Sequence, residues 1–324
     1  MKKIFAVVLA LVLALTLVAC GGGAATETEA EGAKQVGVCI YQFNDNFMTL
    51  YRQELESYMS GLGDYEITIV DGKNDMAEQT NQVDTFIAQG VDVLIVNLVQ
   101  SSSAATITER AQAADIPVVY INREPSSEDM AAWDKICYVG ADARQSGTFQ
   151  GEIVAELPDQ GDADGDGVVR YVMIMGDPEN VDAQYRTEYS IKALTDAGIE
   201  VECLFEQRGD WDQTKGQELA ATALSQFDNI DVIFCNNDAM ALGAYQAIVA
   251  AGKVDADGKL DGIYLLGVDA LDECVEMVAN GQMTGTVLND HVGQSHVAVD
   301  CAIRYMNGET NETLNVVDYQ KVTV

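Results

Sequence analysis

The feature that most constrains the fold is a repeated alternation of short β-rich runs with helical patterns. In the first half of the chain the β-rich runs span residues 36–41, 65–71, 92–99, 116–122 and 136–140. In the second half they span residues 168–176, 200–207, 231–237, 263–269 and 283–289. Many of these runs are continuously apolar, as parallel strands covered on both faces must be.

The segments between these runs carry helical periodicity. Phe47, Leu50, Tyr51, Leu55 and Tyr58 recur at helical spacing, and Gly61 and Gly63 follow as stop signals. Alternation of this kind predicts βαβ units and an α/β fold with doubly wound parallel sheets. Ten strands make two sheets of about five, and a chain of 324 residues suits two domains. The polar stretch 158–167 is predicted to be a surface loop.

The N-terminus is typical of an export signal. Lys2 and Lys3 precede an apolar run over residues 4–18, which is shorter than the ~20 residues that a membrane-spanning helix needs. The sequence LVAC at 17–20, followed by three glycines, resembles the lipobox of bacterial lipoproteins. We expect residues 1–19 to be a signal peptide cleaved before Cys20, the Cys20 sulfur to carry lipid, and residues 20–35 to form a flexible tether. An ordinary secretory signal is the alternative.

Charge and cysteine content narrow the class of protein further. The chain has 52 acidic and 18 basic residues, a net charge of −34, which opposes binding to nucleic acid or to anionic lipid surfaces. Six cysteines follow Cys20, and no two of them form a C-x-x-C pair. Four of the six lie inside apolar strand-like runs, so free buried thiols are predicted at Cys39, Cys137, Cys203 and Cys235.

Polar and aromatic side chains gather where the predicted strands end. In open α/β sheets, ligands bind outside the carboxyl ends of the strands. The candidates at or just beyond these ends are Asn44, Asp45, Asn46, Phe47, Asn122, Glu179, Asn180, Asp182, Arg186, Asp210, Trp211, Asn236, Asn237, Asp238, Asp269, Asn289 and Asp290. Asn and Asp are also common helix N-caps, which is the alternative role for several of them.

The chemistry of this set suits sugar recognition. A sugar hydroxyl both donates and accepts hydrogen bonds, so carboxylates, amides and guanidinium groups can pair with it. The apolar faces of a pyranose pack on aromatic rings, and Phe47 and Trp211, one from each half, could sandwich the sugar.

Seven motifs carry a family resemblance. They are YQFNDNFM at 41–48, NLV at 97–99, NREPS at 122–126, YVGAD at 138–142, NNDAM at 236–240, GVDA at 267–270 and GTVLND at 285–290. These residues resemble those of the galactose/glucose-binding proteins of bacterial ABC sugar transport, which are type I periplasmic binding proteins. The likeness runs from about residue 36 to residue 310.

The resemblance implies two α/β lobes joined by a three-strand hinge that close on one hexose. By this analogy residues 36–141 plus 289–316 form the N-terminal lobe, and residues 142–288 plus 317–324 form the C-terminal lobe. It implies a monomer that delivers D-galactose, D-glucose or a methyl-galactoside to an ABC permease. It also implies an exported protein, anchored to the outer face of the cytoplasmic membrane or periplasmic where an outer membrane exists. A ligand sensor for a chemoreceptor or kinase, and a binding protein for another sugar such as ribose, remain alternatives.

The resemblance also implies individual sugar contacts. The positions that match are Asp45, Phe47, Asn122, Asp182, Arg186, Trp211, Asn237, Asp269 and Asn289. Asn180 stands where the family has a histidine, which leaves the preferred hexose open.

An acidic loop is the remaining motif. D-x-D-x-D-G at 162–167 matches the first half of an EF-hand calcium loop, with Asp162, Asp164 and Asp166 as ligands. Met173 occupies the position of the usual twelfth-position acid. The resemblance implies that the Val168 carbonyl and Asp231 complete the shell. Arg170, in the ninth position, opposes calcium and could itself neutralise the three aspartates.

An enzyme is the competing class. The sequence contains no G-x-S-x-G motif, no Walker A motif and no dinucleotide fingerprint after a strand. A glycosidase needs two opposed carboxylates, and Asp45, Asp182 and Asp269 keep that alternative open. The sequence nevertheless predicts a binding protein without enzymatic activity.

Overall fold

The computed structural model describes residues 32–63 and 65–324. The predicted signal peptide, Cys20 and most of the predicted tether lie outside the described residues. Within the described part of the chain, no helix combines the length and the apolar character needed to cross a bilayer.

Twelve strands are present in the described residues. They are β1 Lys34–Ile40, β2 Tyr65–Asp71, β3 Val93–Val96, β4 Val118–Ile121, β5 Ile136–Gly140, β6 Val169–Met175, β7 Val201–Arg208, β8 Val232–Cys235, β9 Tyr264–Leu266, β10 Thr286–Leu288, β11 Leu314–Val316 and β12 Gln320–Val322. The first ten overlap the ten predicted runs; most are shorter than predicted, β2 and β5 have the predicted bounds, β1 begins two residues earlier and β7 is shifted by one residue.

Helices connect almost all of these strands. They are α1 Asn46–Leu62, α2 Met76–Gln89, the 3-10 helix η1 Ser101–Ser103, α3 Ala104–Ala113, α4 Ser127–Met130, α5 Ala143–Ala155, α6 Val181–Asp196, α7 Gln213–Gln226, α8 Asp238–Ala250, α9 Asp272–Ala279 and α10 His291–Met306. The stretch 158–167 forms the loop between α5 and β6.

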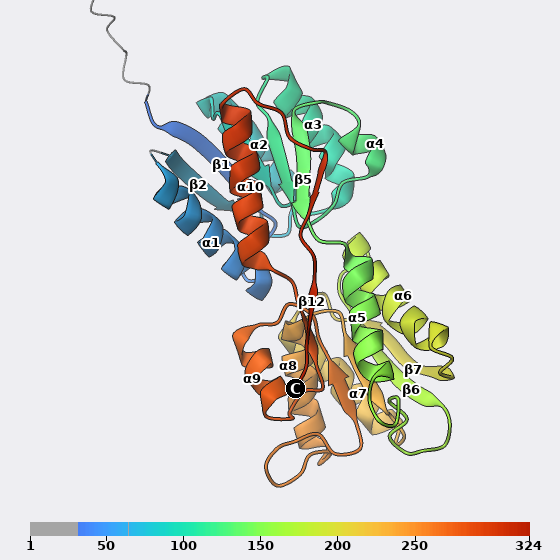
Figure 1. Cartoon of the computed structure of the whole chain (residues 1–324). Coiled ribbons are helices and arrows are strands. Elements are labelled where there is room, and N and C mark those ends of the chain that lie inside the picture. The colour runs from blue at the N-terminus through green and yellow to red at the C-terminus, as the bar shows by residue number, and fades with distance from the viewer. Residues whose placement is uncertain (1–31, 64) are drawn as a thin grey trace, which may run out of the picture. The chain divides into compact units, whose positions relative to one another are not determined.

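The strands form two parallel sheets and one short antiparallel pair (Figure 1). The first sheet has the order β11-β5-β4-β3-β1-β2 and the second the order β7-β6-β8-β9, while β10 forms an antiparallel pair with β12 and one parallel bridge, from Leu288 to Asp269 just beyond β9. The predicted α/β fold with two parallel sheets is therefore confirmed. The two sheets have six and four strands, close to the predicted five in each: β11 joins the first sheet, and β10, predicted for the second, pairs mainly with β12.

Each parallel sheet is covered by helices on both faces. In the first sheet, Val38 and Ile40 pack with α1 and α10, while Cys39 between them packs with α2 and α3. In the second sheet, Ile233 belongs to the layer with α7 and α8, while Val232 faces the other layer with α5 and α6. Alternate residues thus enter opposite cores, which is why the sequence runs are continuously apolar.

The chain passes three times between the two sheets. It leaves β5 at Gly140 and enters α5 at Ala143, and it returns between Leu288 in β10 and His291 in α10. The third passage runs from β11 to β12, where the Val317 amide donates to the Gly140 carbonyl at 2.9 Å. These three passages are called the crossing segments below.

The cysteine prediction is correct at most positions and wrong at one. All six cysteines of the described residues are free thiols, and Cys39, Cys137 and Cys235 are buried as predicted. Cys203 is exposed, because it lies on β7, an edge strand of the second sheet with mostly exposed and half-buried residues.

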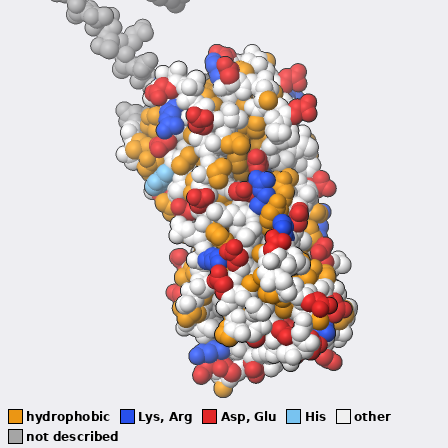
Figure 2. Space-filling view, turned by 45° about the vertical axis from the view of Figure 1, so that its right-hand side comes forward, with side chains coloured by type: hydrophobic (Ala, Val, Ile, Leu, Met, Phe, Trp, Pro, Cys, Tyr) orange, Lys and Arg blue, Asp and Glu red, His pale blue; other side chains and the backbone are white. Residues whose placement is uncertain are grey.

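The acidic excess lies on the surface. Figure 2 shows Asp and Glu side chains spread over the visible face, with fewer Lys and Arg side chains among them. On this face the negative charge is dispersed and does not form a single acidic patch.

Candidate functional site

A cavity lies where the carboxyl ends of strands from both sheets meet. The free space among its lining residues is about 30 Å³, and it rises to about 340 Å³ when the open mouth is included. All ten residues selected through the family resemblance line it, together with three others. The lining residues are Tyr41, Asp45, Phe47, Met48, Asn122, Arg123, Asn180, Asp182, Arg186, Trp211, Asn237, Asp269 and Asn289.

Three of the candidates both cap a helix and line the cavity. Asp45 Oδ1 accepts the Met48 amide at 2.7 Å, and Asn180 and Asn237 cap α6 and α8 in the same manner. The N-cap role and a ligand role are therefore compatible. Capping fixes the side chain and leaves its second polar atom for other contacts, as when Asp45 Oδ2 accepts the Tyr41 hydroxyl at 2.6 Å.

Two aromatic residues come from opposite sheets. Phe47 lies at the start of α1 and packs edge to face with Tyr51 and His291 at ring-centroid distances of 6.0 and 6.4 Å. Trp211 follows β7. Its indole Nε1 is buried and has no hydrogen-bond partner among the described residues.

The backbone is strained at several cavity residues. Asn122, Trp211 and Asp269 have positive φ angles of 62°, 65° and 123°, a region that costs a non-glycine residue free energy. Such conformations persist only where surrounding contacts hold them. At Asn122, the Asn97 amide donates to the side-chain oxygen and the Tyr138 hydroxyl donates to the carbonyl, at 3.1 and 2.8 Å.

Arg186 is one of two buried arginines that line the cavity, the other being Arg123. The guanidinium of Arg186 lies 3.9 Å from Asp182 Oδ2 and 4.0 Å from Asp269 Oδ1, and only 4% of this side chain is exposed. It donates to the Asn236 carbonyl at 2.7 Å and to the Tyr319 hydroxyl at 3.1 Å. Its Nε is buried without a partner among the described residues, so the site retains an unpaired donor.

Burial shifts the protonation equilibria of the carboxyl groups. It raises the pKa of Asp182 to about 6, although Arg186 opposes the shift. Burial also raises the pKa of Asp269 well above its ordinary value. Removing a carboxylate from water disfavours its charged form, so these two groups are poised to be stabilised by any ligand that donates hydrogen bonds to them.

Sequence reasoning missed Tyr41, Met48 and Arg123. The Arg123 guanidinium stacks over the Tyr41 ring at 3.8 Å and is almost fully buried. It directly follows Asn122 in the NREPS motif. The signal that could have identified Arg123 is its position, since it is a basic residue next to Asn122, a predicted sugar contact at the end of a strand.

The chain matches the periplasmic binding protein domain over residues 36–310. The chain belongs to the periplasmic binding protein family. One relative is the D-galactose/methyl-galactoside binding periplasmic protein of Haemophilus influenzae, 36% identical and covering 85% of this chain and 82% of its own. Another is the putative rhizopine-binding protein of Rhizobium meliloti, 34% identical and covering 91% of both chains.

A solved structure gives the same result for the fold. An ABC transporter solute-binding protein of Bacillus halodurans with bound myo-inositol is 29% identical, with a TM-score of 0.80, and the match covers 91% of this chain and 96% of that chain. Members of this family bind solutes and do not catalyse reactions, so the glycosidase alternative is excluded.

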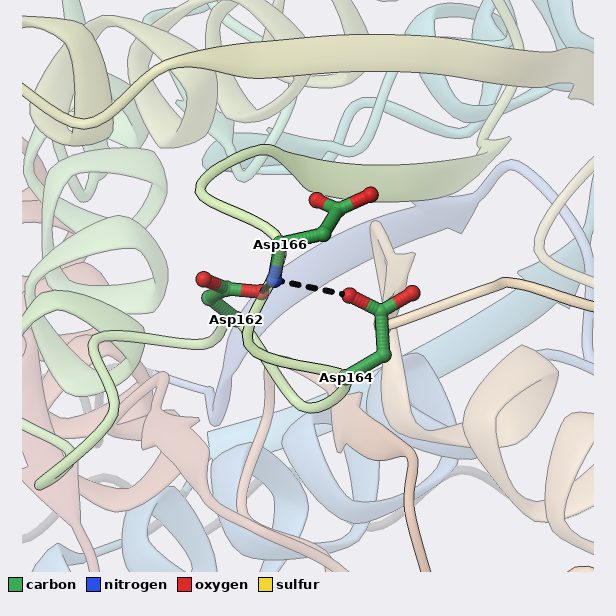
Figure 3. Close-up of side chains that lie close together, drawn as sticks. All are labelled: Asp162, Asp164 and Asp166. Atoms are coloured by element: carbon green, nitrogen blue, oxygen red, sulfur yellow. Dashed lines mark hydrogen bonds between the residues drawn. The ribbon is translucent and has the colours of Figure 1, made fainter.

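The acidic loop of this periplasmic binding protein brings three carboxylates together (Figure 3). Oxygen atoms of Asp162, Asp164 and Asp166 lie within 4.8 Å of one another, so the group could hold a metal ion. Several of these oxygens already accept backbone amides. Asp162 accepts from Gly165 and Gly167, both at 2.9 Å, and Asp164 accepts from Asp166 at 3.2 Å.

The other implied calcium ligands are arranged less favourably. Asp231 is outside this close set, and its two oxygens accept the backbone amides of Ala163 and Arg170 at 3.1 and 2.7 Å. The Val168 amide donates to Asp166. The Arg170 guanidinium forms ion pairs with Asp166 at 2.8 Å and Asp164 at 3.8 Å. A cationic side chain therefore already lies against the carboxylates, and the residues fit a calcium shell poorly.

Proposed function

We propose that this protein captures a hexose, D-galactose or D-glucose, in the cavity between the two sheets and delivers it to an ABC permease. The observation that carries the proposal is the composition of the cavity. It combines carboxylates, amides and guanidinium groups with two aromatic rings, one from the end of each sheet. The similarity to the galactose/methyl-galactoside binding protein supports the same ligand class.

The unpaired donors of the cavity support a polyhydroxylated ligand. Arg186 Nε and Trp211 Nε1 are buried without partners among the described residues, and burying a donor without an acceptor is costly. Sugar oxygens would accept from these groups, and sugar hydroxyls would donate to Asp182 and Asp269. A pyranose, with several ring hydroxyls and a hydroxymethyl group, satisfies both requirements at once.

A cyclitol is the second candidate ligand. The solved structure with bound myo-inositol is 29% identical over 91% of this chain, and myo-inositol, like a pyranose, is a six-membered ring whose hydroxyl groups are mostly equatorial. Asn180, with one donor and one acceptor in the side-chain amide, is compatible with either ring. Ribose is a third candidate, and a smaller furanose would leave more of the buried donors unpaired.

Titration calorimetry with the chain from residue 33 onward tests the proposal. The panel comprises D-galactose, D-glucose, methyl-galactoside, D-ribose and myo-inositol. We expect a hexose to bind most tightly. Trp211→Ala should weaken binding by about 2 kcal/mol or more, as removal of a buried aromatic anchor does. Trp133→Ala, which removes the other tryptophan of the chain, is the control. Preference for ribose or myo-inositol, or no effect of Trp211→Ala, would contradict the hexose assignment.

We further propose that the protein acts outside the cytoplasmic membrane as a lipoprotein anchored through Cys20. The N-terminal sequence supports this proposal, since Cys20 follows a signal peptide-like run. A role as a ligand sensor for a chemoreceptor or kinase is the alternative use of the same cavity. Transport of the bound sugar in cells that carry or lack a cognate permease would separate these two uses.

We propose that Arg170, and not a calcium ion, neutralises the acidic loop in this chain. Its ion pairs with Asp164 and Asp166 support this assignment. So do the hydrogen bonds that both carboxylate oxygens of Asp231 accept from backbone amides. Calcium binding at this loop is expected to be weak.

A further inference from the structure

Tyr319 lies on the third crossing segment, between β11 and β12. It is 4% exposed and belongs to the buried layer between the second sheet and α5. Its backbone amide donates to Gln145 Oε1 of α5 at 2.7 Å. Both the ring and the backbone of Tyr319 are therefore held in place, although the segment that carries it runs between two sheets.

The hydroxyl of Tyr319 contacts a cavity residue directly. It accepts a hydrogen bond from Arg186 Nη2 at 3.1 Å, and the Arg186 guanidinium carbon lies 5.9 Å from the centre of the tyrosine ring. Burial raises the pKa of this hydroxyl to about 12, so it stays protonated and neutral at physiological pH. Tyr319 does not itself line the cavity.

The hydrogen bond to Tyr319 is one of only two that fix the guanidinium within the described residues. The other runs from Arg186 Nη1 to the Asn236 carbonyl at 2.7 Å. The two carboxylates, at 3.9 and 4.0 Å, are beyond hydrogen-bond distance. Tyr319 and Asn236 thus hold the two terminal nitrogens, and Nε is left without a partner.

We propose that Tyr319 is a positioning residue that fixes the Arg186 guanidinium for the ligand and couples it to the third crossing segment. This inference rests on the proposed function, because it assumes that Arg186 contacts the bound sugar. The coupling works in both directions. A ligand that pairs with Arg186 also stabilises the arrangement of residues 317–319, and a shift of that segment changes the geometry of Arg186.

The variant Tyr319→Phe removes the hydroxyl and keeps the ring. We expect the Kd for the best ligand of the panel to rise about tenfold or more, because a hydrogen bond to a charged group contributes about 1.5 kcal/mol or more. Tyr120→Phe is the matched control. Tyr120 is fully buried and its hydroxyl makes two hydrogen bonds, to Thr108 and Ala104, but it is not among the cavity residues. The Tyr120→Phe substitution should lower the melting temperature and leave the Kd for the ligand unchanged.

Hydrogen exchange at saturating ligand separates positioning from simple packing. In the wild-type protein, ligand should slow amide exchange over residues 317–320. In Tyr319→Phe, also at saturation, that protection should be lost, while protection at α6 and at residues 45–48 remains. An unchanged Kd, or full protection of residues 317–320 in the variant, overturns the inference.

A second measurement does not depend on the ligand. In the unliganded protein, Tyr319→Phe and Arg186→Lys should have non-additive effects on the free energy of unfolding, because the two side chains share one contact. If no sugar of the panel binds to the wild-type protein, the proposed function fails. The double-mutant cycle still decides the inference in that case, since additive effects overturn it.

Discussion

The indole ring of Trp211 lies directly over Gly176, in the space that a side chain at residue 176 would fill. A Cβ atom on residue 176 would be 2.1 Å from Cη2 and 2.2 Å from Cζ2 of the indole. The ring has little freedom to move away, because the Trp211 backbone is held at a φ of 65° and its carbonyl accepts from the Asn237 side chain. The glycine at the end of β6 thus determines where the aromatic surface of the cavity lies.

The variant Gly176→Ala should therefore displace the indole and weaken sugar binding. We expect the Kd measured by calorimetry to rise tenfold or more, approaching the roughly 2 kcal/mol effect of removing the anchor itself. In a Trp211→Ala background the same substitution should have little further effect, since the clash is gone. Gly61→Ala is the control, because a Cβ at that exposed helical position meets nothing within 4 Å. Wild-type sugar affinity in Gly176→Ala would show that the position of the Trp211 indole does not affect binding.

Sugar binding should release protons near pH 6. Burial raises the pKa of Asp182 to about 6, and hydroxyl groups that donate to a carboxylate favour its ionised form. The pKa of Asp182 should therefore fall when sugar binds, and affinity should decrease as the pH is lowered from 7 to 5, by at most about tenfold per pH unit for one linked proton.

Calorimetry at pH 6 in two buffers with different ionisation enthalpies measures this proton release. The Asp182→Asn variant should bind more weakly and should release fewer protons. Proton uptake on binding would mean that Asp182 is protonated in the complex and donates to the sugar, contrary to our expectation.

Asp238 makes stability depend on pH in a defined direction. Its carboxylate is fully buried, accepts from the Thr286 hydroxyl and the Leu271 amide at 2.7 and 2.8 Å, and has a pKa raised by burial to about 6. Because the ordinary value is 3.8, the folded state binds more protons than the unfolded state between these two values. This group therefore stabilises the fold at low pH, and its contribution is lost as the pH rises from about 4 to about 6.

The Asp238→Asn variant should remove this dependence. The side-chain amide can accept from Leu271 and donate to Thr286, so packing is preserved and no charge is buried. We expect the stability of the variant relative to wild type, measured by urea unfolding, to increase from pH 4 to pH 7. Asp228→Asn, at an exposed position, is the control. A difference in unfolding free energy between Asp238→Asn and wild type that stays constant from pH 4 to pH 7 would contradict the raised pKa of Asp238.

The sequence was most informative where strand ends and motifs coincide. Parallel strands buried on both faces leave continuous apolar runs, so the sequence predicts the strands and the polar residues at their carboxyl ends. The family resemblance selects from these the ten residues that line the cavity. Their role in binding stays a prediction. The sequence failed where the structure depends on short or distant pairings. The strand Leu314–Val316 has only three residues, two of them exposed, and no local pattern marks it.

Tyr319 illustrates the same limit. It lies 133 residues from Arg186 in the chain, and nothing in its local sequence indicates a contact with the cavity. In the sequence, Gly176 resembles any glycine that follows a strand, and its contact with the Trp211 indole is visible only in the folded structure. Local patterns predict where an element lies and which face is buried, whereas contacts between crossing segments require the assembled fold.

Membrane anchoring should depend on Cys20. We expect Cys20→Ala either to release processed protein from the membrane or to leave the precursor uncleaved, because the lipid on this sulfur would anchor the processed protein. Membrane fractionation followed by immunoblotting measures both outcomes. Cys203→Ala, which removes an exposed thiol on β7, should leave anchoring intact. Retention of a processed Cys20→Ala protein at the membrane would exclude the lipoprotein assignment.

The charge of Arg170 should set the calcium affinity of the acidic loop. Its guanidinium lies 2.8 Å from Asp166 and 3.8 Å from Asp164, where it competes with a cation for the same oxygens. We expect a chelator to lower the melting temperature of the wild-type protein only slightly, because a weakly bound ion stabilises the native state little.

The variant Arg170→Gln removes that competitor and leaves a side chain that can donate to or accept from the loop. Calcium should then raise the melting temperature of the variant more than that of wild type, and magnesium, which demands tighter octahedral geometry, should raise it less. Lys192→Gln is the matched control, since it breaks an exposed ion pair with Asp196 on α6 and should not alter the calcium response. A large chelator-induced drop in the wild-type protein, reversed by calcium and not by magnesium, would show that calcium binds despite Arg170. An unchanged calcium response in Arg170→Gln would show that the geometry of the carboxylates and Asp231, and not the guanidinium charge, prevents binding.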